Sequence, residues 1–267
     1  VPVPVSTPDP ARLRGGLARL RGIAADAQAE LVLTESKLLE LLTAAGASEQ
    51  LAGMESWIAT EGLEGDIGAW SRADVSADEL AYLQYTSGST SAPRGVMITH
   101  ANALANCAGL TAVCVPGEEG RLLSWLPHFH DFGLVHGVVW PFVAGMPAYL
   151  MSPLSFLRRP LRWLDAISRF AITHSGAPNF AYASCVQALR DHPEWSGDLD
   201  TWAVASCGAE PIQATTAQAF RNAFARHGLK PEAFAPAYGL AEATLLACIK
   251  PHGREAALLW VDAASLG

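Results

Sequence analysis

A run of hydroxyl side chains between two short apolar segments is the strongest chemical signal in the sequence. It reads YTSGSTSAPRGV from Tyr85 to Val96, and five of the six residues from Thr86 to Ser91 carry hydroxyl groups. Gly88 allows a positive φ or close approach to a ligand, so the loop can surround phosphate oxygens with donors, and Arg94 adds a forked positive charge. The same residue types dominate solvated turns, which is the alternative, and the GxxxxGK[ST] spacing of a P-loop NTPase is absent.

This loop resembles the phosphate-binding loop of the AMP-forming acyl and aryl adenylating enzymes, whose usual form is YTSGSTGxPKGV. Ser91 stands in place of the glycine and Arg94 in place of the lysine. Both changes keep the hydroxyl groups and the positive charge, while they alter loop flexibility and the geometry at the leaving phosphates. The resemblance implies that the ATP-binding residues of this loop are Thr86, Ser87, Gly88, Ser89, Thr90 and Arg94.

A second segment, WLPHFHDFG from Trp125 to Gly133, is similar to the LPxxHDxG region of the same family. The resemblance places His130 beside the reacting carboxylate and the α-phosphate, where an imidazole can orient groups or neutralise developing charge. Taken alone, a single histidine is more often a core or helix-capping residue. His128 is compatible with a purely structural role.

A third segment, SCGAEP from Ser206 to Pro211, resembles the strand-end turn that packs along the adenine in this family. A Gly-Ala pair after a short apolar strand lies where ligands bind in open α/β sheets, at the carboxyl ends of the strands. The resemblance therefore assigns Gly208, Ala209 and Glu210 to the ATP site. The alternative is an ordinary strand-to-helix turn with Pro211 at the first helical position.

The fourth segment, AYGLAEAT at 237–244, resembles the family's YGxxE motif. An aromatic ring followed by glycine can stack on a purine, and a carboxylate four residues later offers the oxygen ligands that Mg²⁺ requires. The resemblance places Tyr238 and Gly239 at the adenine and Thr244 near the α-phosphate. The alternative is a helix N-terminus with Glu242 in its first turn, which any protein can use.

The stretch from Ser152 to Val186 indicates a branch of the family. It reads SPLSFLRRPLRWLDAISRFAITHSGAPNFAYASCV and is close to the fatty acyl-AMP ligases, more so than to the acyl-CoA synthetases. Without the family, its four arginines would form a surface stripe, and Trp163 and Ile167 a core face. The acyl-binding residues that the resemblance implies are Phe132, Gly133, Ser175, Asn179 and Phe180.

The resemblance implies an ATP-dependent ligase for a medium- or long-chain fatty acid. The carboxylate attacks the α-phosphate of Mg·ATP, pyrophosphate leaves, and the acyl group passes to the phosphopantetheine thiol of an acyl carrier protein. Catalysis would be mainly positioning and charge neutralisation, with Mg²⁺ held by Thr86 and Glu242, and with Arg94 and His130 beside it. The alternatives are an acyl-CoA synthetase and a non-catalytic nucleotide-binding module.

Short apolar segments that alternate with helical patterns predict how these residues are positioned. Strands are expected at 31–34, 82–85, 96–99, 122–126, 148–151, 172–174, 203–206 and 234–237. Helices are expected at 10–27, 36–45, 101–113, 133–144, 160–170, 178–190 and 211–226, and residues 61–78 read as an irregular connection. This order predicts an α/β fold with mainly parallel sheets flanked by helices, as in the large N-terminal domain of the adenylating enzymes.

Within that domain, residues 1–80 would form a leading portion and residues 81–267 the ATP- and acyl-binding portion. The resemblance places the ribose-binding aspartate, the hinge and the small C-terminal domain outside the chain, so we expect residues 1–267 alone to turn over poorly or not at all.

Composition narrows the classes of partner. The chain has 267 residues, of which 50% are hydrophobic and 16% charged, and this predicts a large core. A formal net charge of −8 argues against general binding to nucleic acid or anionic lipid. The apolar stretch at 132–151 is interrupted by His136, prolines and glycines, so we expect no membrane span. Five cysteines without zinc-type spacing favour a reducing compartment, and we expect a cytoplasmic protein.

Overall fold

The computed structural model describes residues 1–8, 13–44, 56–86, 94–259 and 261–262 of the chain. They form two compact units, Val1–His100 and Ala101–Gly267, which are described in turn. The expected division into a leading portion, residues 1–80, and an ATP- and acyl-binding portion, residues 81–267, is a division by function. It stays a prediction.

The first unit contains two small two-stranded sheets. β1 (Leu31–Thr34) and β2 (Ser56–Ala59) are parallel, and β3 (Leu80–Thr86) and β4 (Arg94–Thr99) are antiparallel. Leu17 of α1 (Leu13–Asp26) and Leu42 of α2 (Ser36–Ala44) are buried against Trp57. These helices, three of the strands and the irregular connection after Gly62 confirm the sequence predictions, whereas no sequence pattern predicts β2.

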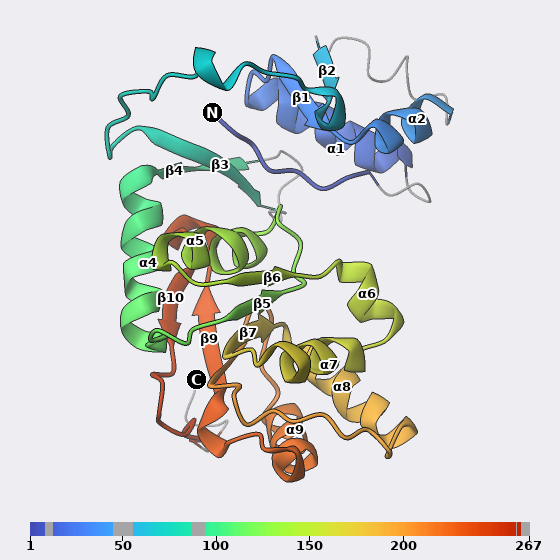
Figure 1. Cartoon of the computed structure of the whole chain (residues 1–267), viewed down its shortest axis with the longest axis vertical. Coiled ribbons are helices and arrows are strands. Elements are labelled where there is room, and N and C mark those ends of the chain that lie inside the picture. Colours follow the sequence, from blue (N-terminus) through green and yellow to red (C-terminus); the bar gives the residue numbers. More distant parts are fainter. Residues whose placement is uncertain (9–12, 45–55, 87–93, 260, 263–267) are drawn as a thin grey trace. The chain divides into compact units, whose positions relative to one another are not determined.

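The second unit is built on a six-stranded sheet in the order β10-β9-β8-β7-β5-β6 (Figure 1). In chain order its strands are β5 (Leu122–Ser124), β6 (Ala148–Leu150), β7 (His174–Ala177), β8 (Val204–Cys207), β9 (Phe234–Gly239) and β10 (Leu246–Ile249). The strands β5 to β9 are parallel, and β10 is antiparallel to β9. The mainly parallel sheet confirms the predicted fold class, and the antiparallel edge strand β10 is an addition to it.

Helices cover both faces of this sheet. In chain order they are α4 (His100–Cys114), η4 (Phe132–Val139), α5 (Trp140–Ala144), α6 (Pro153–Arg158), α7 (Leu161–Phe170), α8 (Asn179–Asp191) and α9 (Ala214–Phe224). Adjacent residues of β7 show the two faces, because the His174 ring contacts Trp140 of α5 while Ser175 Oγ accepts a hydrogen bond from Trp163 of α7. On the second face Tyr182 of α8 lies against Phe220 of α9.

The helix expected at 133–144 consists of two parts with different turns. η4 has wide i→i+5 turns, and α5 follows it until Gly145, whose φ of 68° ends the helix. Two glycines bring η4 close to the end of β5: a Cβ atom at Gly133 would overlap the Pro127 carbonyl, and one at Gly137 would lie 2.6 Å from Ser124 Oγ. The side chain of Asp131 accepts from the backbone N–H of Phe132 and caps the start of η4.

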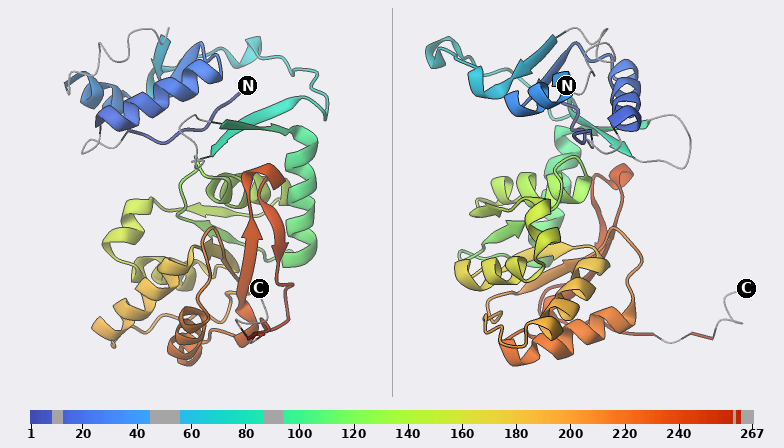
Figure 2. Two further views of the ribbon diagram at one scale, coloured as in Figure 1. Left: turned by 180° about the vertical axis from the view of Figure 1, so that it is seen from behind. Right: turned by 90° about the vertical axis from the view of Figure 1, so that its right-hand side faces the viewer.

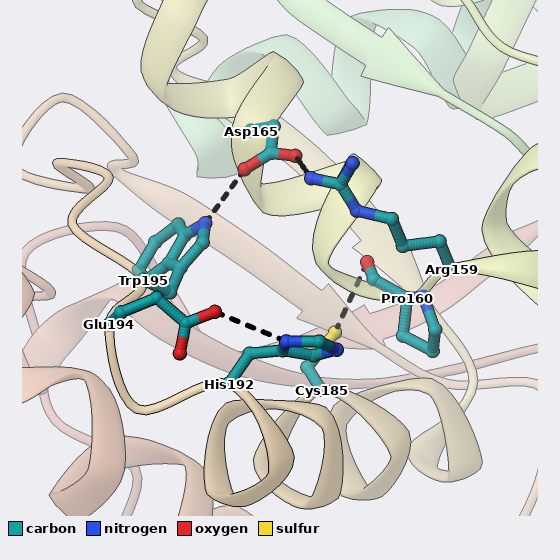
Figure 3. Close-up of polar contacts among 7 residues, drawn as sticks. All are labelled: Arg159, Pro160, Asp165, Cys185, His192, Glu194 and Trp195. Carbon is teal, nitrogen blue, oxygen red and sulfur yellow. Dashed lines mark hydrogen bonds and ion pairs between the residues drawn. The ribbon is translucent and has the colours of Figure 1, made fainter.

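The corner between α6 and α7 differs in detail from the expectation. Pro160 is the N-cap of α7 and not its first residue, and α6 is an additional short helix. Figure 3 shows how the corner is held: Asp165 accepts a 2.7 Å hydrogen bond from Trp195 Nε1 and pairs with Arg159. The thiol of Cys185 donates to Pro160 O at 3.8 Å, which joins α8 to the same corner.

The surface and core expected for this region are confirmed. Trp163 and Ile167 are fully buried. The arginines expected on the surface are exposed, namely Arg158, Arg159, Arg162 and Arg169. Within the described part of the chain, no helix is long and apolar enough to cross a membrane.

Candidate functional site

Most of the predicted site residues of the second unit lie at one edge of its sheet. Because β5, β7, β8 and β9 are parallel, their carboxyl ends meet at the same edge, where open α/β sheets bind ligands. The predicted residues that end or follow these strands are His130, Phe132, Gly133, Asn179, Phe180, Gly208, Ala209, Glu210, Tyr238 and Gly239. The fold thus gathers three of the four sequence motifs at this carboxyl edge.

His130 is paired with its neighbour Asp131. His130 Nδ1 lies 2.5 Å from Asp131 Oδ1, and this hydrogen bond raises the pKa of the imidazole above its ordinary value near 6.5. The His130 side chain is 53% exposed, whereas the carboxylate is almost buried. The Asp131 carboxylate thus favours the protonated imidazole, which remains accessible to an anionic substrate. The sequence motif does not by itself assign a role to Asp131, although its position next to His130 is a usable signal.

Backbone strain coincides with the predicted nucleotide segments. Five described residues other than glycine have a positive φ, and three of them, Gln28, Val115 and Ala171, lie just after helices α1, α4 and α7. The other two are Ala209 (φ 67°) and Thr244 (φ 71°). Strain of this kind persists where the surrounding structure enforces it, and it concentrates at ligand sites.

The side chains of Asn179 and Glu210 join the starts of two neighbouring segments. The Glu210 carboxylate accepts from the backbone N–H of Phe180 at 2.6 Å, and Asn179 Oδ1 accepts from the backbone N–H of Gln213 at 3.0 Å. These oxygens satisfy backbone donors at the start of α8 and before α9. The segment that contains Glu210 connects β8 to α9, but α9 begins at Ala214, so the expected helix start at Pro211 is wrong. The ligand contacts expected of Asn179 and Glu210 stay predictions.

The predicted acyl-binding residues differ in accessibility. Ser175 is fully buried, donates to Leu123 O at 2.7 Å and accepts from Trp163 Nε1 at 2.8 Å, so its hydroxyl group serves the core. Gly133 provides close packing and Phe132 is buried beside Gly176. Phe180, which is 42% exposed, is the member of the set with a large free surface. An acyl-binding role for the set stays a prediction.

The segment from Tyr238 to Thr244 combines exposed and buried groups. Tyr238 is 61% exposed, and its ring is available to stack on a planar ligand. Glu242 lies in a short 3-10 turn, is exposed, and has no hydrogen-bond partner among the described residues, so its oxygens fit a hard cation such as Mg²⁺. Thr244 is buried, and the Asn106 side chain of α4 bonds to the backbone on both sides of it. No sequence pattern predicts this role of Asn106, because the contact spans 137 residues.

The remaining motif belongs to the first unit. Thr86 ends β3 and Arg94 begins β4, and the two are directly opposite each other in the ladder. Ser87, Gly88, Ser89 and Thr90 lie outside the described residues. Tyr85 anchors this end of the hairpin, because its hydroxyl donates to Asp26 Oδ2 at 2.6 Å and its ring covers Gly95. Burial and Asp26 raise the pKa of Tyr85 to about 12, so this hydroxyl stays a donor. The Mg²⁺ site expected at Thr86 and Glu242 stays a prediction.

Comparisons with known proteins agree with these motifs. A family model described as "AMP-binding enzyme" matches residues 1–261. The chain is 42% identical over 268 aligned residues to the medium-chain-fatty-acid–[acyl-carrier-protein] ligase JamA of Moorena producens, a match that covers 100% of this chain and 45% of that protein. It is 36% identical over 265 residues to a long-chain-fatty-acid–AMP ligase of Mycobacterium tuberculosis, covering 95% of this chain and 44% of that protein.

A solved structure supports the fold. The fatty acyl-adenylate ligase of L. pneumophila, determined with acyl adenylate and pyrophosphate, superposes with a TM-score of 0.83 at 37% identity. The superposition covers 90% of this chain and 41% of that one. The chain thus spans less than half the length of these relatives.

Proposed function

Because this chain belongs to the family of AMP-binding enzymes, we propose that the full-length protein containing it activates a medium- or long-chain fatty acid with ATP. A carboxylate oxygen of the fatty acid forms a bond to the α-phosphorus of ATP. The bond from that phosphorus to the bridging oxygen breaks, so acyl-adenylate and pyrophosphate are the products.

The main support for the proposal is that sequence motifs far apart in the chain lie together at the carboxyl edge of the six-stranded sheet. His130, Ala209 and Tyr238 come from three segments that are far apart in sequence and that end or follow parallel strands of one sheet. The strained backbone at Ala209 and the exposed ring of Tyr238 would present a surface to adenine, and the His130–Asp131 pair would provide charge for the phosphate.

The residues of this chain would act mainly by orienting two anions and neutralising their charge. A protonated His130, favoured by Asp131, would stabilise negative charge on the α-phosphate, and the guanidinium of Arg94 would bind phosphate oxygens. Glu242 and Thr86 would hold Mg²⁺, which neutralises phosphate charge when bound. Preorganised groups of this kind are worth about 3 to 4 kcal/mol each in transition-state stabilisation.

We propose an acyl carrier protein as the acceptor of the acyl group, through its phosphopantetheine thiol. The support is the name of the Moorena relative, which is an acyl-carrier-protein ligase. Formation of acyl-CoA is the second candidate, and a cytoplasmic location stays a prediction from composition.

The test is a mass-spectrometric assay of the full-length protein with ATP, Mg²⁺ and a series of fatty acids, with CoA or a holo carrier protein added in turn. We expect acyl-AMP that persists with CoA and transfers to the carrier. Efficient acyl-CoA formation would favour the second candidate, and no adenylate with any acid would contradict the proposal.

A matched pair of histidine variants tests the site. His130→Gln should lower kcat/KM on the order of 100-fold, because it removes the charge beside the α-phosphate. His128→Gln changes an exposed histidine two residues earlier and should have little effect. Equal effects of the two substitutions would contradict the role of His130.

We also propose that residues 1–267 alone form little or no acyl-adenylate, since the chain spans less than half of its relatives. Robust adenylate formation by this chain would overturn that proposal.

A further inference from the structure

One amide side chain of α4 holds the turn between β9 and β10. Asn106 Nδ2 donates to Ala243 O and to Leu246 O, both at 3.1 Å, and Asn106 Oδ1 accepts from the backbone N–H of Leu246 at 3.2 Å. The helix lies alongside β10 in opposite views of the molecule (Figures 1 and 2). The side chain therefore bridges two elements that are far apart in sequence.

The turn that it holds is strained. Thr244 has φ 71° and ψ −52° and lies between Ala243 and Leu246, the two residues that Asn106 contacts. It is buried, with 6% of its surface exposed. Its backbone N–H donates to Ala241 O at 2.8 Å, and Leu240 N–H donates to Leu245 O at 2.9 Å. A threonine adopts this conformation only where neighbouring contacts over-determine it. The three Asn106 bonds act on the residue immediately before Thr244 and on the residue two positions after it.

The helix is well suited to hold this position. Ala103, Cys107 and Leu110 of α4 are buried, so the side of the helix next to Asn106 is fixed by the core. Only an amide of this length both donates twice and accepts once at this site, since a carboxylate lacks the donors and an aliphatic side chain lacks both.

We propose that Asn106 is a positioning residue for Mg·ATP, which acts by holding Thr244 and the exposed carboxylate of Glu242 in their binding geometry. This inference rests on the proposed function, in which Glu242 holds Mg²⁺ and Thr244 lies near the α-phosphate. Asn106 itself contacts only the backbone of the turn.

The test compares Asn106→Leu and Asn106→Asp in the full-length protein by steady-state adenylation kinetics. We expect kcat/KM for Mg·ATP to fall on the order of 10- to 100-fold, and KM for the fatty acid to change less than about twofold. The Mg²⁺ concentration for half-maximal rate should rise. In Asn106→Asp the new carboxylate faces two carbonyl oxygens, and its protonation restores one hydrogen-bond donor. The activity of Asn106→Asp relative to wild type should therefore rise as the pH is lowered. The relative activity of Asn106→Leu should not change with pH in this way.

Thr111→Val is the matched control on the same helix. It removes the bonds of Thr111 Oγ1 to Cys107 O and to Trp140 Nε1, and it should lower stability without changing either KM. Wild-type kinetics in Asn106→Leu, or a loss divided equally between Mg·ATP and the fatty acid, would overturn the inference.

Hydrogen exchange separates this inference from the proposed function. The Leu246 amide should exchange faster in Asn106→Leu than in wild type, whether or not the protein is active. Unchanged exchange would overturn the positioning contact. A wild-type protein that forms no acyl-adenylate, with faster exchange in the variant, would overturn the proposed function and the catalytic part of the inference.

Discussion

The interior of the second unit and the carboxyl edge of its sheet are constructed in opposite ways. On the face covered by α7, α8 and α9, large aromatic side chains are fully buried, and three of them have paired polar atoms. Trp163 Nε1 donates to Ser175 Oγ, the Tyr182 hydroxyl to Ser206 O, and Trp202 Nε1 to Val204 O. The Trp163 ring contacts those of Tyr182 and Trp202 edge to face, with ring centroids 5.4 Å and 5.2 Å apart.

The carboxyl edge has the contrary features. Ala209 and Thr244 are strained, Tyr238 and Glu242 are exposed, and His130 is half exposed beside a nearly buried carboxylate. The strained backbone and the exposed side chains do not stabilise the fold, so the edge depends on the interior to hold it. Substitutions in the two regions should therefore have different effects. Those in the interior should change the free energy of unfolding, and those at the edge should change the binding and turnover of ligands.

The largest effect is expected at the centre of the aromatic interior. Trp163→Ala should lower the free energy of unfolding by about 3 to 5 kcal/mol, because it leaves a cavity and removes the donor to Ser175 Oγ. Chemical denaturation measures the change. Trp70→Ala is the control, since this tryptophan is 75% exposed and its loss should cost under about 0.5 kcal/mol. Similar costs for the two would break the comparison.

A buried histidine should make the interior sensitive to acid. Burial, with His174 nearby, lowers the pKa of His136 to about 3, and Nδ1 has no hydrogen-bond partner in the described part of the chain. The stabilisation from keeping His136 neutral is complete above its ordinary pKa near 6.5, and it is lost as the pH falls toward 3.

His136→Leu should remove this loss, which amounts to at most about 1.4 kcal/mol per pH unit. The stability of the variant relative to wild type should rise by about 3 kcal/mol between pH 7 and pH 4, as measured by denaturation across that range. His128→Gln, at an exposed position, should leave the pH dependence unchanged. An acid response of His136→Leu identical to that of wild type would contradict the assignment.

Two glycine substitutions sharpen the contrast between close packing and open surface. Gly133→Ala should destabilise by about 2 to 3 kcal/mol, because the new Cβ atom would overlap Pro127 O and displace η4 from the end of β5. Gly109→Ala should stabilise by about 0.5 to 1 kcal/mol, because the new Cβ on α4 would have no described atom from outside the adjacent backbone within 4 Å. Thermal unfolding of both variants measures these changes in stability. A change in the same direction for both variants would contradict the contrast between close packing and open surface.

The smallest expected effect tests strain at the edge. Ala209→Gly and Ala171→Gly both relieve a positive φ, of 67° and 48°, and each should stabilise by about 0.5 kcal/mol after the entropy cost of glycine. Ala171 ends α7, so its substitution should leave catalysis unchanged. Ala209→Gly should raise KM for ATP a few-fold, because the backbone beside the proposed adenine site becomes less rigid. Equal kinetics in the two variants would show that the strain at Ala209 has no function.

Local patterns predict the elements well where side chains alone decide them. β1 lies at 31–34 as expected, and α8 begins one residue from its predicted start. The apolar residues predict a strand at 172–174, whereas β7 runs from His174 to Ala177. Its polar and small residues form a strand because they pair between β5 and β8 in the centre of the sheet, and that pairing overrides local propensity.

The candidate site shows the same division. Hydroxyl groups, glycines and the Tyr-Gly pair at 238–239 identify the chemistry by residue type and spacing, which chain order preserves. The helix capping by Glu210 and the core role of Ser175 depend on partners 30 and 52 residues away. No local sequence pattern includes partners so far apart in the chain. The solvent accessibility of the individual site residues could therefore not be predicted from the sequence.

The sequence by itself determined the alternation of helix and strand, the motifs and the family, because these follow from residue type and near-neighbour spacing. The tertiary structure alone decided which motif residues are exposed, which are committed to the core, and that Asn106 holds the turn around Thr244. The reason is physical: parallel strands bring distant chain segments to one edge, and hydrogen bonds there depend on positions that only the folded backbone establishes.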